Sequence, residues 1–131
     1  MVSDRVGDFI IRLKNAAAIG ARDVSLPYSS HLFAIAQKLK ELGFVTSVTT
    51  DGTEVKKRLI VTLAYDARGV AKLRGVKRVS KPGRRLYVSH AVAHRVKGGT
   101  GARIISSPRG IVSDSEARRV RVGGEELFEI W

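Results

Sequence analysis

The sequence predicts an α+β fold, built as one domain or as two small lobes that pack together. Two stretches before residue 43 repeat their apolar residues at the three-and-four spacing of amphipathic helices. Residues 44–63 and 101–131 are instead short β-branched runs separated by turn residues. Apolar patterning pauses at Tyr65–Gly69, where a basic bias begins. A boundary there divides an N-terminal α/β lobe, residues 1–65, from a mostly β C-terminal lobe, residues 66–131.

The first predicted helix lies between Ser3, which is placed to cap it, and Gly20, which ends it. Its apolar stripe comprises Val6, Phe9, Ile10, Leu13 and Ala17. The opposite face has charges of both signs, so we interpret it mainly as solvated surface. Within that face, Arg12, Lys14 and Asn15 could still touch a phosphate backbone.

A short strand, a second helix and a hairpin follow in the first half. The strand is Val24–Leu26, closed by Pro27, and either Ser29 or Ser30 can cap the helix that Gly43 ends. The helix stripe comprises Leu32, Ile35, Ala36, Leu39 and Leu42. Two further runs, Phe44–Thr50 and Leu59–Leu63, are expected to pair as antiparallel strands joined around Asp51-Gly52. The first half is therefore helix, strand, helix, hairpin.

Residues 72–88, KLRGVKRVSKPGRRLYV, form a segment rich in Lys and Arg around a Pro-Gly pair. Pro82 and Gly83 suit the central positions of a type II turn, where the second residue needs a positive φ. The apolar residues on either side are Val76 and Val79 before the turn and Leu86 and Val88 after it. We expect a β-hairpin with a basic rim, in which Tyr87 offers a stacking ring or a hydroxyl.

Residues 89–101 carry two motifs of low specificity. A short helix over Ser89–Lys97 would place His90 and His94 on one face, a spacing that suits zinc. No Glu follows His90 and no third ligand is near, so we predict no metal site. Gly98–Gly101 lacks the Lys-Ser/Thr ending of a phosphate-binding loop, and we interpret it as a flexible entry to the next strand.

The last 31 residues carry the most consistent local signals. Ile104-Ile105 leads into Ser106-Ser107-Pro108-Arg109-Gly110, where Pro and Gly suit a type I turn that would hold two hydroxyls and a guanidinium together. After Ile111-Val112, the residues Ser113 and Glu116 form a capping box that starts a helix at Asp114. This helix is expected to end near Val120 because Gly123-Gly124 follows. The terminal strand contains Leu127, Phe128, Ile130 and Trp131.

Charge and composition limit the class of protein. The formal net charge is +12 over 131 residues with 44% hydrophobic content. Residues 1–65 hold 9 basic and 6 acidic side chains, whereas residues 66–131 hold 15 and 6. Such an excess favours a polyanionic partner, nucleic acid first, and points to the second half as the binding face.

Several other classes lack the residues that they need. The chain has no cysteine, no Gly-x-Ser-x-Gly elbow and no acidic pair in an apolar setting, so we expect neither an enzyme nor a cofactor. No apolar run approaches the roughly 18 residues of a membrane span, and the N-terminus lacks a signal-peptide pattern. We expect a soluble protein that is not exported and has no membrane partner.

Four blocks together resemble the family of the eighth protein of the small ribosomal subunit, in its bacterial form. They are SDRVGDFIIRLKNA at 3–16, RVSKPGRRLYV at 78–88, GARIISSPRGIVSDSEARR at 101–119 and VGGEELFEIW at 122–131. They follow the family's order over nearly the whole length. Three positions depart from its usual residues: Ser107 replaces Thr, Arg109 replaces Lys and Arg5 replaces Pro. The first keeps the hydroxyl and the second keeps the charge, although Arg adds a planar fork.

The resemblance implies two small lobes and direct binding to the central region of small-subunit ribosomal RNA, in a cytoplasmic or organellar ribosome. Its neighbours there would be other small-subunit proteins, first of all the fifth-protein family. Taken together, the resemblance and the residue patterns give as candidate RNA-binding residues Lys81, Arg84, Arg85, Tyr87, Ser106, Ser107, Pro108, Arg109, Gly110 and Glu125 in the second lobe, with Arg12, Lys14 and Asn15 in the first.

Two other functions compete with a structural role in the ribosome. A translational regulator would bind a stem of its own messenger RNA through the same surface, as some family members do. An RNA-processing enzyme would need a carboxylate cluster or a His general base beside the basic face. Glu125, Glu126 and Glu129 are expected to be strand residues instead.

Overall fold

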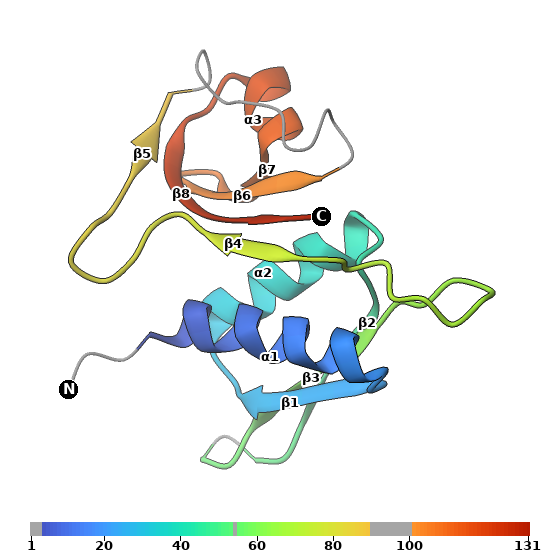
Figure 1. Cartoon of the computed structure of the whole chain (residues 1–131). Coiled ribbons are helices and arrows are strands. Elements are labelled where there is room, and N and C mark those ends of the chain that lie inside the picture. The colour runs from blue at the N-terminus through green and yellow to red at the C-terminus, as the bar shows by residue number, and fades with distance from the viewer. Residues whose placement is uncertain (1–3, 54, 90–100) are drawn as a thin grey trace. The chain divides into compact units, whose positions relative to one another are not determined.

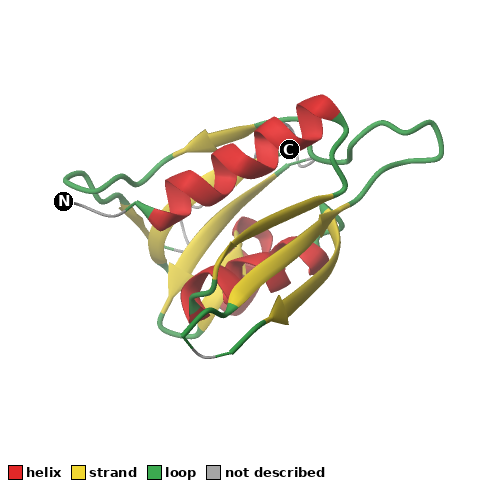
Figure 2. Cartoon of the chain, turned by 90° about the horizontal axis from the view of Figure 1, so that it is seen from below, coloured by secondary structure: helices red, strands yellow, loops and turns green. Residues whose placement is uncertain are grey.

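The computed structural model describes residues 4–53, 55–89 and 101–131, which contain three helices and eight strands. The predicted α+β class is confirmed. By its contacts the chain divides into two compact units, Asp8–Arg74 and Met1–Gly7 with Gly75–Trp131. Helices and strands alternate in the first unit, whereas strands predominate in the second (Figures 1 and 2).

The first unit has the predicted order of elements. They are α1 (Arg5–Ile19), whose first turn belongs to the other unit, β1 (Asp23–Pro27), α2 (Ser30–Glu41), β2 (Val45–Asp51) and β3 (Arg58–Leu63). The predicted β2–β3 hairpin is confirmed, and β1 lies on the other edge of β3, giving the antiparallel order β1-β3-β2. The sequence near β1 does not predict its pairing with β3, because the paired residues of β3 lie more than 30 positions later in the chain.

The core of the first unit comes from one face of the sheet and the apolar stripes of the helices. Strands β1 and β3 bury alternate residues, as the two-residue period of a half-buried strand requires. The largest buried side chains are Phe9, Ile10 and Leu13 of α1, Leu32, Ile35 and Leu39 of α2, and Leu26 and Leu59 of the strands. This pattern matches the predicted stripes, except that Ala16 is more buried than Ala17 and that Val6 and Leu42 are only half-buried.

The helix caps were partly predicted. Ser29 caps α2, where its hydroxyl accepts a hydrogen bond from the backbone N of Leu32 at 3.1 Å. Ser3, the predicted cap of α1, lies outside the described residues. The carboxylate of Asp4 instead accepts from the backbone N of Gly7 at 3.0 Å, which is the geometry of an N-cap.

The second unit is built around its last strand. Its elements are β4 (Val76–Arg78), β5 (Tyr87–Val88), β6 (Ala102–Ser107), β7 (Gly110–Ser113), α3 (Asp114–Val120) and β8 (Gly124–Ile130). The antiparallel sheet has the order β4-β8-β6-β7, and β5 also pairs with β8. Strand β8 is therefore central, with β6 on one edge and both β4 and β5 on the other (Figure 1).

The predicted hairpin over residues 76–88 is wrong in its pairing, although its turn forms. Strands β4 and β5 do not form a ladder with each other: Val76 pairs with Ile130, and Tyr87 pairs with Glu125. An isolated bridge joins Lys81 and Arg84 around the turn, where Gly83 has the expected positive φ of 85°. Sequence signals locate a turn, but they do not show that β8, whose paired residues lie 36 to 54 positions later, takes both legs as partners.

The C-terminal elements form as predicted. A two-residue turn joins β6 to β7, and Ser113 and Glu116 form the capping box of α3. The helix ends at Val120 as predicted, but the residue that ends it is Arg121, which adopts the left-handed conformation with φ 58° before the glycines are reached. Gly123 and Gly124 serve close packing instead. A Cβ on Gly124 would collide with the carbonyl oxygen of Ser106 in β6.

The motifs at residues 90–100, including His90, His94 and Gly98–Thr100, lie outside the described residues. In the described ranges, no group of three His, Asp or Glu side chains is arranged to hold a metal ion. None of the described helices is long and apolar enough to cross a membrane.

Candidate nucleic-acid interface

Three residues predicted from separate sequence blocks lie side by side across the second sheet. Glu125 of β8 pairs with Tyr87 of β5 on one side and with Ser106 of β6 on the other. Directly opposite residues of antiparallel strands point to the same face of a sheet. Tyr87 is 71% exposed, so its ring is available to a ligand. We call this set, Tyr87, Glu125 and Ser106, the cross-strand row.

A fourth predicted residue joins the row through an ion pair. Arg85 donates from Nη1 to Oε2 of Glu125 at 3.0 Å, and its side chain stays half exposed while that of Glu125 is 18% exposed. Glu125 thus has a protein partner already, and its carboxylate holds the Arg85 guanidinium beside Tyr87. The arrangement supports Arg85 as the cation of the row and Glu125 as the group that orients it.

The turn after the row uses its two hydroxyls differently. Ser107 donates from Oγ to the carbonyl of Gly110 at 2.8 Å and accepts from the backbone N of Arg109 at 3.2 Å. Its hydroxyl therefore closes the turn, where Gly110 has φ 110°. The Ser106 hydroxyl makes no hydrogen bond to any described residue. Ser106 is the hydroxyl left to donate to a ligand, and Arg109 lies exposed beside Pro108 in the turn.

A basic loop, Val79–Leu86, lies between β4 and β5. Lys81 and Arg84 exchange backbone hydrogen bonds of 2.9 Å in each direction across the turn, and both side chains are exposed. Ser80 is 2% exposed, and its Oγ accepts from the backbone N of Leu86 at 2.9 Å and donates to its carbonyl at 3.2 Å. The buried Ser80 hydroxyl thus links the two sides of the loop, which have no strand pairing with each other. Sequence reasoning overlooked Ser80, whose one signal is a Ser directly before Lys-Pro-Gly.

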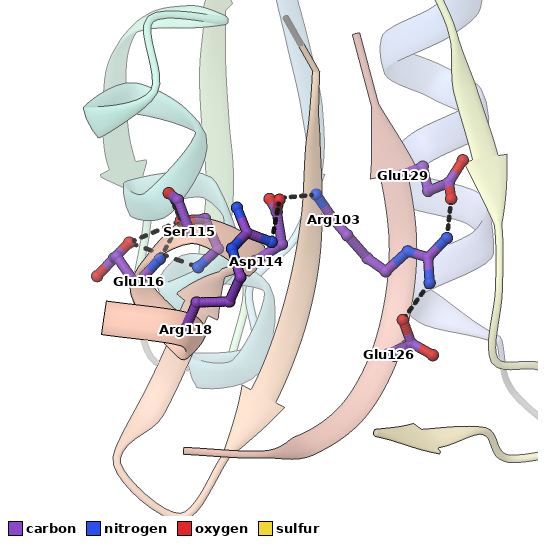
Figure 3. Close-up of polar contacts among 8 residues, drawn as sticks. Arg103, Asp114, Ser115, Glu116, Arg118, Glu126 and Glu129 are labelled. Atoms are coloured by element: carbon purple, nitrogen blue, oxygen red, sulfur yellow. Dashed lines mark hydrogen bonds and ion pairs between the residues drawn. The ribbon is translucent and has the colours of Figure 1, made fainter. Parts of the chain in front are cut away.

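Charged side chains, most of them largely buried, connect β6, β8 and α3 (Figure 3). Arg103 forms ion pairs with Glu126 and Glu129, and its backbone N donates to Oδ1 of Asp114 at 3.1 Å. Asp114 also accepts from Arg118 at 3.1 Å. Burial lowers the pKa of Arg103, whereas its hydrogen bonds to Glu129 and Glu126 raise it. The hydrogen bonds have the larger combined effect, so the pKa is raised from its ordinary value. The sequence patterns did not reveal this network.

The predicted contacts of the N-terminal half all lie on α1. Arg12 is held by Asp8 at 3.0 Å and donates to the carbonyl of Ser25 at 3.2 Å. Lys14 and Asn15 are exposed, and neither side chain has a hydrogen-bond partner among the described residues. These residues belong to the first unit, whereas all other predicted site residues belong to the second.

Comparison with known proteins identifies the family. Residues 4–131 match the family of ribosomal protein S8. The chain is 39% identical to the small ribosomal subunit protein uS8 of Sorangium cellulosum over 131 residues, which is the full length of both chains. It is 40% identical to uS8 of Roseiflexus castenholzii over 130 residues, covering 99% of this chain and 98% of the relative. The uS8 of Mycoplasmopsis synoviae is also 40% identical, over 131 residues, with the same coverage. The chain therefore belongs to the ribosomal protein S8 family.

Proposed function

We propose that the chain is a structural component of the small ribosomal subunit that binds the central region of its ribosomal RNA directly and helps to assemble it. The cross-strand row carries the proposal, because it brings together the exposed ring of Tyr87 from β5, the free hydroxyl of Ser106 from β6 and the guanidinium of Arg85 from the basic loop, which Glu125 of β8 orients. Family membership supports it independently.

The chemistry of the row suits RNA better than DNA. A-form RNA exposes 2′-hydroxyls and phosphates across a shallow minor groove, and it offers unstacked bases at irregular stems. The small Ser106 side chain lets a sugar-phosphate backbone come close, and Tyr87 offers a face for a base. Arg85, Lys81, Arg84 and Arg109 supply the salt-dependent attraction.

The finer partners are part of the same proposal. Lys14 and Asn15, exposed on α1, would add backbone contacts from the N-terminal lobe, with Arg12 beside them. The resemblance supports contacts with other small-subunit proteins, first of all the fifth-protein family, within a cytoplasmic or organellar ribosome. A messenger stem of the same shape would occupy the same surface. We propose that the division between these two RNA-contacting parts lies near residue 66, where the basic bias begins, with residues 66–74 grouped by their contacts with the first unit.

The test is binding of the purified chain to labelled fragments that tile the small-subunit ribosomal RNA. We expect one stem of the central region to be bound in preference to the others, protected from chemical cleavage and recovered intact. Equal binding to all fragments would overturn the proposal of direct specific binding. Cleavage of the RNA by the wild type but not by a variant of the row would favour a processing enzyme instead.

A further inference from the structure

The second unit has a groove that the cross-strand row does not include. It has a volume of about 410 Å³ and lies along β4, the basic loop and β8. Its lining comprises Lys77, Arg78, Val79, Lys81, Arg84, Leu86, Arg103, Glu126 and Glu129. Alternation along β6 sends Arg103 and Ser106 to opposite faces of the sheet, so the groove and the row are separate surfaces that share the basic loop.

The charges left unpaired in this groove are all positive. Lys77, Lys81 and Arg84 are exposed and make no ion pair with any described residue. The other cation of the rim, Arg78, is engaged by the Asp4 carboxylate and donates to the carbonyl of Ser80 at 2.6 Å. The groove therefore presents three cations to an anionic ligand.

The two acidic residues of the groove, Glu126 and Glu129, are both neutralised by Arg103. In the strand register Glu129 lies opposite Lys77 of β4 and Arg103 of β6, and of these two cations Arg103 forms the ion pairs, with both Glu129 and Glu126. The Arg103 side chain is 17% exposed and extends from β6 to both carboxylates (Figure 3). Without its guanidinium, two nearly buried carboxylates would face the ligand, and like charges would repel it.

We propose that this groove binds phosphates of the RNA backbone through Lys77, Lys81 and Arg84, and that Arg103 is a positioning residue that makes the groove accept an anion. The proposal rests on the proposed function and adds a second RNA-contacting surface to it. RNA is favoured over a protein partner because only Val79 and Leu86 of the lining are apolar. Protein interfaces depend on a desolvated apolar centre, whereas a phosphate backbone needs only the cations.

The first experiment compares the salt dependence of binding to the preferred ribosomal RNA fragment for the wild type, Lys77→Gln and Arg119→Gln. Lys77→Gln should reduce the slope of log affinity against log salt by about 0.7–0.9, the value for one lost phosphate contact. Arg119 is an exposed cation of α3 outside the groove, so its variant should keep the wild-type slope. Equal slopes for both variants would overturn the proposal.

The second experiment isolates Arg103. Arg103→Met should weaken RNA binding about tenfold or more at low salt, because like charges then oppose each other in the groove. The loss should narrow as salt screens the repulsion. In the triple variant Arg103→Met/Glu126→Gln/Glu129→Gln the carboxylates are gone, and affinity should return toward the wild-type value. A triple variant as weak as Arg103→Met, with wild-type thermal stability, would overturn the positioning role.

The outcomes separate this inference from the proposed function. Failure of the wild type to prefer any ribosomal RNA fragment counts against the proposed function, and with it against the groove. A wild type that binds normally, with groove variants that match Arg119→Gln in RNA binding but lose association with another small-subunit protein, overturns the groove proposal alone. If Arg103→Met does not fold, the salt dependence of Lys77→Gln still tests the groove proposal. This variant should fold, because it changes an exposed side chain of an edge strand.

Discussion

Gly75 and Trp131 exchange both of their backbone hydrogen bonds, at 3.0 Å each, so the terminal residue extends the pairing of β8 with β4 by one position. The indole lies directly over Gly75, because a Cβ built on this glycine would lie only 2.6 Å from Cζ2 of Trp131. The absence of a side chain at Gly75 is therefore what lets the ring lie there.

Substitution of Gly75 should destabilise the protein through this ring. Gly75→Ala forces the indole to move, and overpacking of this kind typically costs about 1–3 kcal/mol in the free energy of unfolding. Denaturant unfolding measures the change. In a Trp131→Ala background the same substitution should cost clearly less, since the obstructing ring is gone. Equal costs in both backgrounds would show that the ring does not matter.

Sequence reasoning succeeded where the signal was local. The capping box of Ser113 and Glu116 starts a helix within four residues, and the Pro108-Arg109 turn joins neighbouring strands, so both were predictable. The partners of β8 were not, because β4 and β5 lie 36 to 54 residues before the residues that they pair with, and this pairing depends on the tertiary fold.

The same limit applies to the candidate site. The motifs named Tyr87, Ser106 and Glu125, but only the register of the sheet shows that they are adjacent. The ion pairs of Arg103 have no sequence signature, since its two carboxylates are 23 and 26 positions away. The neighbouring residues in the sequence thus predict whether a residue lies in a helix, a strand or a turn. Its contacts at the site depend on strands that are distant in the sequence.

Ser80→Ala should loosen the basic loop. The substitution leaves the half-buried backbone N of Leu86 without its partner, which typically costs about 1–3 kcal/mol of stability, whereas the carbonyl of Leu86 keeps its hydrogen bond from the backbone N of Glu126 at 2.8 Å. RNA affinity should fall as well, because Lys81 and Arg84 lose their fixed positions. The exposed Ser89 provides the matched control, and Ser89→Ala should change neither quantity. Thermal unfolding and RNA titration of the two variants check this.

The ion pair between Asp4 and Arg78 should make stability depend on pH. The Arg78 hydrogen bond lowers the pKa of Asp4 from its ordinary value of 3.8, and the backbone N of Gly7 adds to this against the opposing effect of burial. Because the folded pKa lies below the unfolded one, the contribution is fully present above the unfolded pKa and is lost as pH falls through the folded pKa.

Asp4→Asn isolates that contribution, because Asn caps helices about as well as Asp. The wild type should exceed the variant in free energy of unfolding by a constant amount from neutral pH down to about pH 5, and the difference should shrink at lower pH. An Arg78→Gln background should remove most of the difference at every pH. Urea unfolding over a pH series gives the comparison, and a difference that grows toward acid would contradict the assignment.

The two serines of the β6–β7 turn should separate specificity from stability. Ser106 has a free hydroxyl in the cross-strand row, whereas Ser107 closes the turn through Gly110 and Arg109. Ser107→Ala should therefore lower thermal stability, and it should weaken RNA binding only as far as the turn itself becomes less ordered. Ser106→Ala should leave the melting temperature nearly unchanged.

In RNA binding, by contrast, Ser106→Ala should have the larger effect of the two substitutions. If Ser106 donates to a buried group of the RNA, Ser106→Ala leaves that group unpaired and should cost roughly 1–3 kcal/mol of affinity for the preferred stem. The salt slope should stay the same, because no charge changes and no phosphate contact of a cation is lost. Affinity for a scrambled stem should not change either, so the preference of the chain for its own stem should fall. A Ser106→Ala variant that keeps the full preference would assign shape recognition to the remaining members of the row. Tyr87→Leu would then be the next variant to measure, because leucine keeps an apolar side chain but removes the ring and the hydroxyl.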